Sequence, residues 1–386
     1  MAPVRSPRRT LALATAAYVL GVTAQNTWLF YFVPVALRAA GLEGREAWGF
    51  AASALATMIA VVPAGKLTDK IPRRRAMRIG LGLLALSYLP ILLAPPSLGA
   101  TVLASLLSGT GLAFLAVSFN SYVADLLAKE DMSSAYGATA AVSVLASATG
   151  PLAAAGFISL AGSVALGLRV NGAIFLVASL VGAAITLLLP HVASPTSRAT
   201  LAGGHPRPKR VLPVAILYVF LGLSFGITTP YYGVYFLGPL GIDSGTWGLV
   251  LAFGTAASAA GLFLAGMAGR RASPRVLLVV GQALAALVVL PFLFASTGAL
   301  LDGAYVARML FASTLAPLAN ALLMGDVDPG ARATAQGYTS MAWNAAWTVG
   351  ALGGGYALGT LGGALFPLGG LLAVVGCGVF LVLLRN

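Results

Sequence analysis

Residues 65–75, Gly-Lys-Leu-Thr-Asp-Lys-Ile-Pro-Arg-Arg-Arg, separate two long apolar runs. The first run covers 47–64 and ends directly before this stretch, and the second begins near Met77. A charged side chain in hydrocarbon costs at least about 2.5 kcal/mol, so a segment this basic must lie at a membrane surface. Because loops rich in Lys and Arg remain on the cytoplasmic side, the stretch predicts a short cytoplasmic loop between two membrane-spanning helices.

The composition of the whole chain agrees with an integral membrane protein. Of its 386 residues, 59% are hydrophobic and only 9% are charged, and the mean hydropathy is +0.93. Soluble domains are typically about 25% charged. A net charge of +13 would suggest a nucleic-acid partner in a soluble protein. Here the cations anchor loops, so we expect the lipid bilayer and no nucleic acid as a partner.

The apolar runs predict an all-α membrane protein with twelve transmembrane helices, each near or above the roughly 20 residues that a crossing needs. The N-terminal apolar run, which follows Arg8 and Arg9, continues past Phe32, and this length argues against a cleaved signal peptide. The predicted spans are 11–37, 46–66, 76–94, 98–126, 132–160, 166–190, 211–237, 245–268, 275–296, 299–324, 333–358 and 364–384.

The cations indicate how these spans are oriented. With the N-terminus inside, all of the 23 Lys and Arg residues fall on the cytoplasmic side except Arg38, Arg45, Arg169 and Arg308. This bias predicts a multi-pass protein of the cell (cytoplasmic) membrane with both termini in the cytoplasm.

A polar stretch and an internal repeat divide the chain in two. Residues 191–210 are rich in Pro, Gly and cations and predict a flexible cytoplasmic linker, on which His191 and His205 are expected to be solvated. The flanking segments, 1–190 and 211–386, are predicted to be six-helix bundles. Residue pairs 200 positions apart support this division. They are Tyr18 and Tyr218, Asn120 and Asn320, Gly137 and Gly337, Thr139 and Thr339, and Gly150 and Gly350.

The basic loop resembles the signature loop between the second and third helices of the major facilitator superfamily. That pattern is Gly, three residues, Asp, Arg or Lys, one residue, Gly, and Arg or Lys. The matching residues are Gly65, Asp69, Lys70, Arg73 and Arg74, with Pro72 in place of the second glycine. The resemblance covers essentially the whole chain. It implies the fold of this superfamily, two pseudo-symmetric six-helix bundles, and a secondary transporter that works by alternating access without a cofactor.

The resemblance also implies a cytoplasmic gate at the loop. In the family, a carboxylate at the end of helix two binds cations across the loop and the end of helix four. Asp69, with Arg73 and Arg74 as local cations, matches this role, and Asp125 at the end of the fourth span could join them. The alternative for Asp125 is a solvated acid at a helix end.

The fifth span carries a second family-like pattern. Gly137, Ala146, Gly150-Pro151 and Ala154-Ala155 are similar to the glycine-rich helix-five motif of the superfamily's antiporters, with alanine at three positions. Small residues at helical spacing let helices approach and slide, and Pro151 adds a bend. The motif favours a rocking seam at Gly150 and Pro151 and hence export. The alternative is ordinary packing of small residues.

Substrate-binding candidates are polar and aromatic residues on spans one, seven and eleven. Helices one, four, seven and ten line the cavity in this fold. The candidates are Gln25, Asn26, Trp28, Tyr31, Tyr231, Tyr232, Trp343, Asn344 and Trp347. Uncharged amides beside aromatic faces suit sugars, flat organic molecules and drugs. The alternative for the aromatic residues is packing or an interfacial belt.

Arg308 lies about nine residues into span ten, where its repeat partner is Ser108. A cation inside the membrane predicts a functional site, and Arg308 could clamp an anionic substrate group through two hydrogen bonds. The alternative is that span ten starts later, so that Arg308 snorkels to the outer surface.

The sequence favours export or antiport of a small organic solute, with a proton or a counter-solute as the coupling partner. The alternative is a permease or facilitator that takes up a sugar or an organic anion. None of the ten Asp and Glu residues falls in the middle of a predicted span, which leaves proton coupling open. A polytopic enzyme or receptor is the remote alternative. It would need a cluster of His, Asp, Glu or Cys, and two linker histidines with one cysteine predict no metal site. We expect a monomer.

Overall fold

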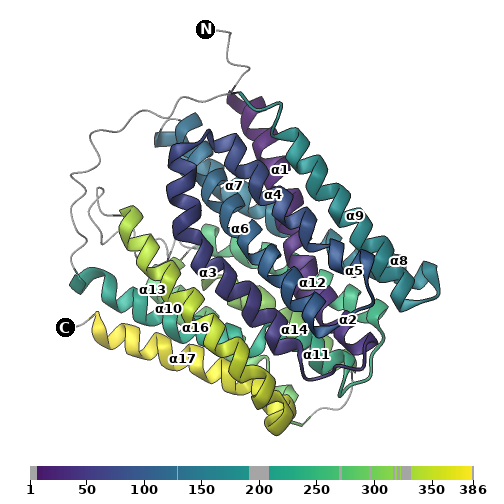
Figure 1. Ribbon diagram of the computed structural model, residues 1–386. Helices are drawn as coiled ribbons and strands as arrows, with labels where there is room; N and C mark the ends of the chain where they lie inside the picture. Colours follow the sequence, from purple (N-terminus) through teal and green to yellow (C-terminus); the bar gives the residue numbers. More distant parts are fainter. Residues whose placement is uncertain are drawn as a thin grey trace. The chain divides into compact units, whose positions relative to one another are not determined.

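The computed structural model describes residues 7–127, 129–190, 208–268, 272–294, 298–315, 318, 319, 322 and 332–384. All regular elements in this part of the chain are helices (Figure 1). Contacts divide the chain into two compact units, Met1–Thr196 and Ser197–Asn386. The boundary falls inside the predicted linker, where residues 191–207, with His191 and His205, lie outside the described residues.

Unit 1 is a bundle in which α6 packs along both α3 and α4, while α1 lies against α9, α7 and α6. Its core contains apolar side chains of α1, α4 and α6, among them Ala14, Leu81 and Phe119. Its elements are α1 (Pro7–Thr27), the π-helical η1 (Trp28–Phe32), α2 (Val33–Ala39), α3 (Glu46–Lys70), α4 (Arg73–Ser87), α5 (Leu89–Leu93), α6 (Leu98–Leu126), α7 (Lys129–Ser147), α8 (Thr149–Ala161) and α9 (Val164–Ile185).

Unit 2 is built around α10, which packs along α16 and α17, while α12 lies against α14 and α13 against α17. Its core includes Leu217, Leu221 and Phe380. Its elements are α10 (Pro208–Thr228), α11 (Tyr231–Leu237), α12 (Ser244–Ala268), α13 (Pro274–Leu287), η3 (Leu290–Leu293), α14 (Gly298–Ala312), α16 (Arg332–Leu361), η5 (Gly362–Ala364) and α17 (Leu365–Leu383).

Prolines account for several breaks within the predicted spans. Proline has no N–H for the carbonyl four residues earlier, and its ring crowds that carbonyl. Accordingly, α7 ends four residues before Pro151, and α4 gives way to α5 beside Pro90. Pro230 separates α10 from α11. The predicted bend at Pro151 is therefore a short interruption between α7 and α8.

Nine stretches of the described residues are long and apolar enough to cross a membrane, and the last, Tyr338–Leu383, contains most of α16 and all of α17. Two predicted spans are not among them. The span 11–37 is helical through α1, η1 and α2, and α14 covers only the first part of 299–324. The count of twelve therefore stays a prediction at these two places.

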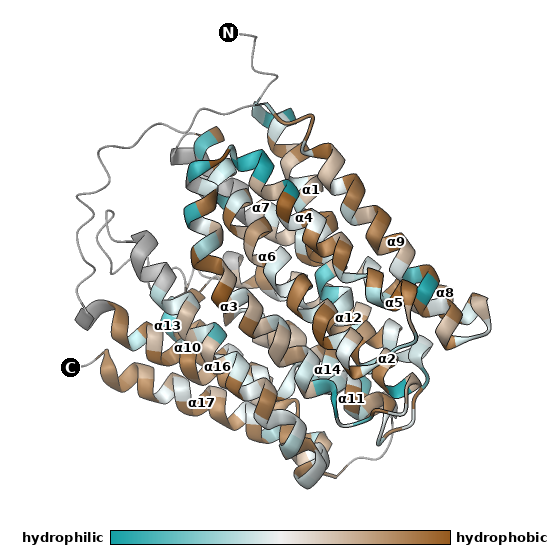
Figure 2. Ribbon diagram, viewed as in Figure 1, coloured by the Kyte–Doolittle hydropathy of each residue, from teal (hydrophilic) through white to brown (hydrophobic). Residues whose placement is uncertain are grey.

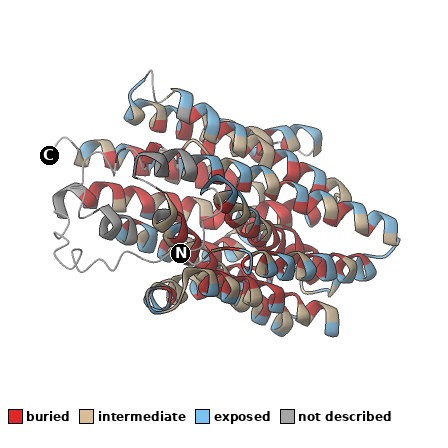
Figure 3. Cartoon of the chain, turned by 90° about the horizontal axis from the view of Figure 1, so that it is seen from above, coloured by how far each residue is buried: buried red, intermediate tan, exposed pale blue. Residues whose placement is uncertain are grey.

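The surface of the helices suits lipid. Hydrophobic residues run along most of the helix lengths, and exposed positions alternate with buried ones (Figures 2 and 3). Large apolar side chains point outward, including Leu93 (81% exposed), Leu160 (83%) and Phe294 (80%). Soluble proteins rarely expose so much apolar surface, whereas a bilayer covers it.

Candidate functional site

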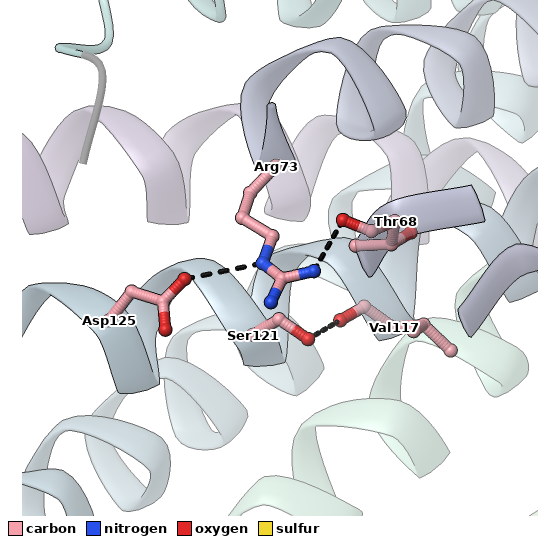
Figure 4. A network of polar contacts seen from close by, with 5 residues as sticks. All are labelled: Thr68, Arg73, Val117, Ser121 and Asp125. Carbon is pink, nitrogen blue, oxygen red and sulfur yellow. Dashed lines mark hydrogen bonds and ion pairs between the residues drawn. The ribbon is translucent and has the colours of Figure 1, made fainter. Parts of the chain in front are cut away.

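The predicted gate residues Arg73 and Asp125 lie together in unit 1 (Figure 4). Arg73 Nε donates to Asp125 Oδ2 at 3.2 Å, and both side chains are only 13% exposed. Arg73 Nη1 also donates to the carbonyl oxygen of Thr68. Arg73 therefore ties the start of α4 to the ends of α3 and α6, the three helix ends that meet at the basic loop.

Two further arginines fasten the start of α4 to the end of α9. Arg74 Nη1 donates to the carbonyl of Leu189 at 2.8 Å, and Arg78 Nε donates to Thr186 Oγ1 at 3.2 Å. The helix-two glycine, Gly65, faces α6 at Val117. Asp69 belongs to α3, but its side chain lies outside the described residues.

The small-residue pattern brings helices into close contact inside each unit. A Cβ built on Gly150 of α8 would overlap Thr27 Oγ1 of α1. The repeat partner, Gly350 of α16, would place a Cβ 2.7 Å from the carbonyl oxygen of Leu223 on α10. The same repeat position therefore packs against the first helix of each unit. Whether this contact slides during transport stays a prediction.

In unit 1, the aromatic candidates belong to the core. Trp28 and Tyr31 lie on η1 and are fully buried. Trp28 Nε1 donates to Ser105 Oγ at 3.1 Å, and its ring packs against those of Phe32 and Tyr88. This packing corresponds to the alternative considered for these residues.

The two amides of α1 differ from each other. Asn26 Nδ2 donates to Ser147 Oγ at 3.2 Å and so links α1 to α7. Gln25 is 5% exposed.

Arg308 lies deep in unit 2, with only 2% of its surface exposed. Its Nη2 donates to Thr228 Oγ1 at 3.1 Å. Its guanidinium carbon lies 5.0 Å from the ring centre of Phe225 and 5.7 Å from that of Tyr232. Nε and Nη1 are buried without an acceptor among the described residues. The structure therefore places this cation among aromatic rings rather than at the surface.

The neighbours of Arg308 come from two consecutive helices of unit 2. Phe225 and Thr228 lie one turn apart on α10, and Tyr232 lies on α11, just after the break at Pro230. Tyr232 stacks on Phe366 at 4.2 Å, and its hydroxyl is buried without a partner among the described residues. Phe225 was not among the predicted site residues.

Tyr231 points to a different neighbour. Its hydroxyl donates to the carbonyl of Ala351, and its ring fills the space beside Gly354 on α16. This residue joins α11 to α16.

The tryptophans of α16 extend the aromatic surroundings of Arg308. The ring centres of Trp343 and Phe225 are 5.4 Å apart, and those of Trp343 and Trp347 are 6.0 Å apart. All three side chains are partly exposed. Asn344 Nδ2 donates to the carbonyl of Ser340 in its own helix at 2.8 Å. We call Phe225, Trp343 and Trp347 the aromatic row, which leads from partly open surface to the buried cation.

The electrostatics of this site are unusual. A buried charge is costly unless it is paired and hydrogen-bonded, and removing the partner of a buried ion pair costs about 3–5 kcal/mol. The acid of α14, Asp302, is six residues from Arg308, and its own Oδ1 is buried without a partner among the described residues. An anionic group that accepts hydrogen bonds from Arg308 would relieve the cost of burying this cation.

Comparisons with known proteins agree on the family and the fold. The family model described as "Major Facilitator Superfamily" matches residues 11–351. A crystal structure of a mutant of the nucleoside transporter NupG is 15% identical with a TM-score of 0.76, and the alignment covers 97% of this chain and 99% of that one. A bacterial homolog of the human lysosomal transporter Spinster, in an inward-facing and occupied conformation, is 15% identical with a TM-score of 0.74, covering 99% and 98%. None of the curated proteins compared with the chain matches it.

Proposed function

Because the chain belongs to the Major Facilitator Superfamily, we propose that it is a secondary transporter that moves a small organic anion across the cell membrane by alternating access. Residues 1–190 and 211–386 form its two six-helix bundles, and residues 191–210 link them on the cytoplasmic side.

The burial of Arg308 carries the choice of an anion. Its side chain is 2% exposed, and two of its three nitrogens have no acceptor among the described residues. Of the solutes considered from the sequence, a sugar or a neutral drug would leave this charge unpaired, whereas a carboxylate or phosphate would accept charge-assisted hydrogen bonds from it. An organic anion is therefore the substrate class that this site favours.

Export is the direction that we propose. Two observations support it. Residues 137–155 resemble the helix-five motif of antiporters, and Gly150 is in close contact with α1. The Arg73–Asp125 ion pair would hold the three helix ends together in one state and release them in the other. Uptake of an organic anion by the same site is the alternative.

Counterflow in proteoliposomes tests the proposal. The solutes are carboxylates (lactate, succinate and benzoate) and neutral compounds (glucose, uridine and benzamide). We expect carboxylates alone to exchange, and Arg308→Gln to reduce their exchange at least tenfold, because the variant keeps the polarity and loses the charge. Arg308→Lys should retain part of the activity, since Lys keeps the charge without the planar donor arrangement.

Arg169→Gln is the matched control, because Arg169 is an exposed cation on α9. It should exchange carboxylates at the wild-type rate. Exchange of neutral solutes that is unaffected by Arg308→Gln, with no carboxylate exchange, would refute the proposal. Imposed gradients in right-side-out and inverted vesicles then distinguish export from uptake.

A further inference from the structure

We propose that the anion is a planar aromatic carboxylate, whose carboxylate accepts hydrogen bonds from Arg308 and whose ring lies against the aromatic row. This inference rests on the proposed function and narrows its substrate class. It is carried by the continuity between the buried cation and the partly exposed rings of Phe225, Trp343 and Trp347.

Phe225 contacts both parts of the site, because its ring centre lies 5.0 Å from the guanidinium carbon of Arg308 and 5.4 Å from the ring centre of Trp343. A ring that lies beside Trp343 and Phe225 can therefore direct an attached carboxylate toward the guanidinium of Arg308.

The tryptophans of the aromatic row offer the surface that the rest of the ligand would contact. The two tryptophans lie one helical turn apart on α16, with ring planes inclined by 32° and centres 6.0 Å apart. Offset or edge-on contact between aromatic rings is favoured beyond the area that it buries. A flat π system matches the row, whereas a saturated ring of similar size can only fill the same space.

Hydrogen-bonding groups surround the aromatic row. Asn344 lies between the two tryptophans in sequence and donates its amide hydrogen to the carbonyl of Ser340, so its carbonyl oxygen remains an acceptor. Thr228 accepts from Arg308 and is fully buried. The charged donors for a ligand therefore belong to Arg308, whereas the Asn344 amide and the indole N–H groups of Trp343 and Trp347 are uncharged. This distribution suits a molecule with its negative charge at one end.

Competition in proteoliposomes separates the aromatic requirement from the requirement for charge. Exchange of radiolabelled benzoate is measured against unlabelled benzoate, cyclohexanecarboxylate and benzamide. We expect benzoate to compete about three- to tenfold better than cyclohexanecarboxylate, which corresponds to the usual strength of an aromatic pair. Benzamide, which has the ring without the charge, should not compete.

Variants then locate the preference. Trp343→Leu should bring benzoate and cyclohexanecarboxylate to equal potency while carboxylate exchange continues, and Trp343→Phe should retain the preference. Trp48→Leu is the control, since Trp48 is 56% exposed on α3. It should behave as the wild type. The thermal midpoint of each variant in detergent shows that it folds.

Equal competition by benzoate and cyclohexanecarboxylate in the wild-type protein would overturn this inference and leave the anion transporter standing. A preference for benzoate that survives Trp343→Leu would overturn the placement of the ring on the row. Absence of exchange for every carboxylate, in a protein that exchanges neutral solutes, would instead refute the proposed function.

Discussion

Asp243 shows how a single side chain sets the start of a helix. It directly precedes α12, and its Oδ1 accepts hydrogen bonds from the backbone nitrogens of Gly245 at 2.8 Å and Thr246 at 3.0 Å. Its Oδ2 accepts from Thr246 Oγ1 at 2.6 Å. These bonds, with that of the Thr246 hydroxyl contributing most, hold the pKa of Asp243 below its usual range. The carboxylate thus caps backbone N–H groups that have no partner within the helix.

Asp243 gives a prediction about pH. Since its pKa is lower in the folded state, its contribution to stability is present above the unfolded pKa of about 3.9 and is lost as the pH falls through the folded pKa. Asp243→Ala should cost about 1 kcal/mol at pH 7 through loss of the cap. Thr246→Val removes the largest cause of the shift, so the pKa of Asp243 should rise and stability should be lost at a higher pH. Thermal midpoints in detergent from pH 7 to pH 3 measure this.

Asp243→Asn is the control, because Asn caps helices well but does not titrate in this range. Its stability should vary less with pH than that of the wild type. An identical pH profile for Asp243→Asn and the wild type would show that the Asp243 carboxylate does not contribute in this way.

Individual residues also show what the sequence could not predict. The depth of Arg308 could only be guessed, because its position depends on where α14 begins and on which face meets α10. Trp28 and Tyr31 stay predicted binding residues, and the structure places both in the core of unit 1, whereas Phe225, which was not predicted, lies beside Arg308. Burial and partners depend on helix rotation, which residue type alone does not determine.

Among the helices, the contact between α8 and α1 depends on the absence of a side chain at Gly150. Thr27 Oγ1 occupies the space of a Cβ there, and it is held by its own hydrogen bond to the carbonyl of Thr23 at 2.7 Å. Threonine is stiff about its first side-chain bond. The neighbour therefore cannot turn aside at low cost.

Gly150→Ala should consequently destabilise the protein by about 1–3 kcal/mol, the usual cost of overpacking a close contact. Gly156→Ala on the same helix meets no atom within 4 Å and should be neutral or slightly stabilising. Adding Thr27→Ala to Gly150→Ala should recover most of the loss, because the obstructing hydroxyl is gone. Thermal midpoints and counterflow rates of the wild type, Gly150→Ala, Thr27→Ala and the double variant form a double-mutant cycle.

Strictly additive effects of Thr27→Ala and Gly150→Ala would contradict a direct contact between these positions. If Gly150→Ala lowers the counterflow rate while the thermal midpoint changes little, the contact also has a role in movement, as the helix-five resemblance suggests.

Apolar runs in the sequence predict where the helices lie better than they predict where a helix is interrupted. Apart from 11–37 and 299–324, the predicted spans coincide with apolar helices of the described residues, because lipid demands about 20 apolar residues per crossing. The break before Pro151 could be anticipated from proline chemistry. The π-helical geometry of Trp28–Phe32 could not, since no residue in Trp-Leu-Phe-Tyr-Phe requires it.

For the whole molecule, the family was predictable because the basic loop, the polar linker and the 200-residue repeat occur together. The arrangement of cations also predicts which loops face the cytoplasm. Cys377 is the sole cysteine and is 1% exposed, so an introduced thiol can be labelled almost without background.

We expect Gly203→Cys, in the predicted linker and outside the described residues, to resist a membrane-impermeant maleimide in intact cells and to react after permeabilisation. Glu43→Cys is the control for the opposite side, since the Glu43 side chain is 63% exposed between α2 and α3. It should react in intact cells. Labelling of Gly203→Cys without permeabilisation would reverse the proposed topology.

The π-helical segment Trp28–Phe32 has one more consequence, for how this protein tolerates changes in length. A π turn absorbs one more residue than an α-helical turn, and the interval from Tyr18 to Trp48 is one residue longer than that from Tyr218 to Trp247. Each residue of an α-helix advances the chain by about 100° around the axis. Deleting one residue within Trp28–Phe32 should therefore return the segment to α-helical turns without such a rotation, so that Gln25 and Asn26 keep their direction and every loop keeps its present length.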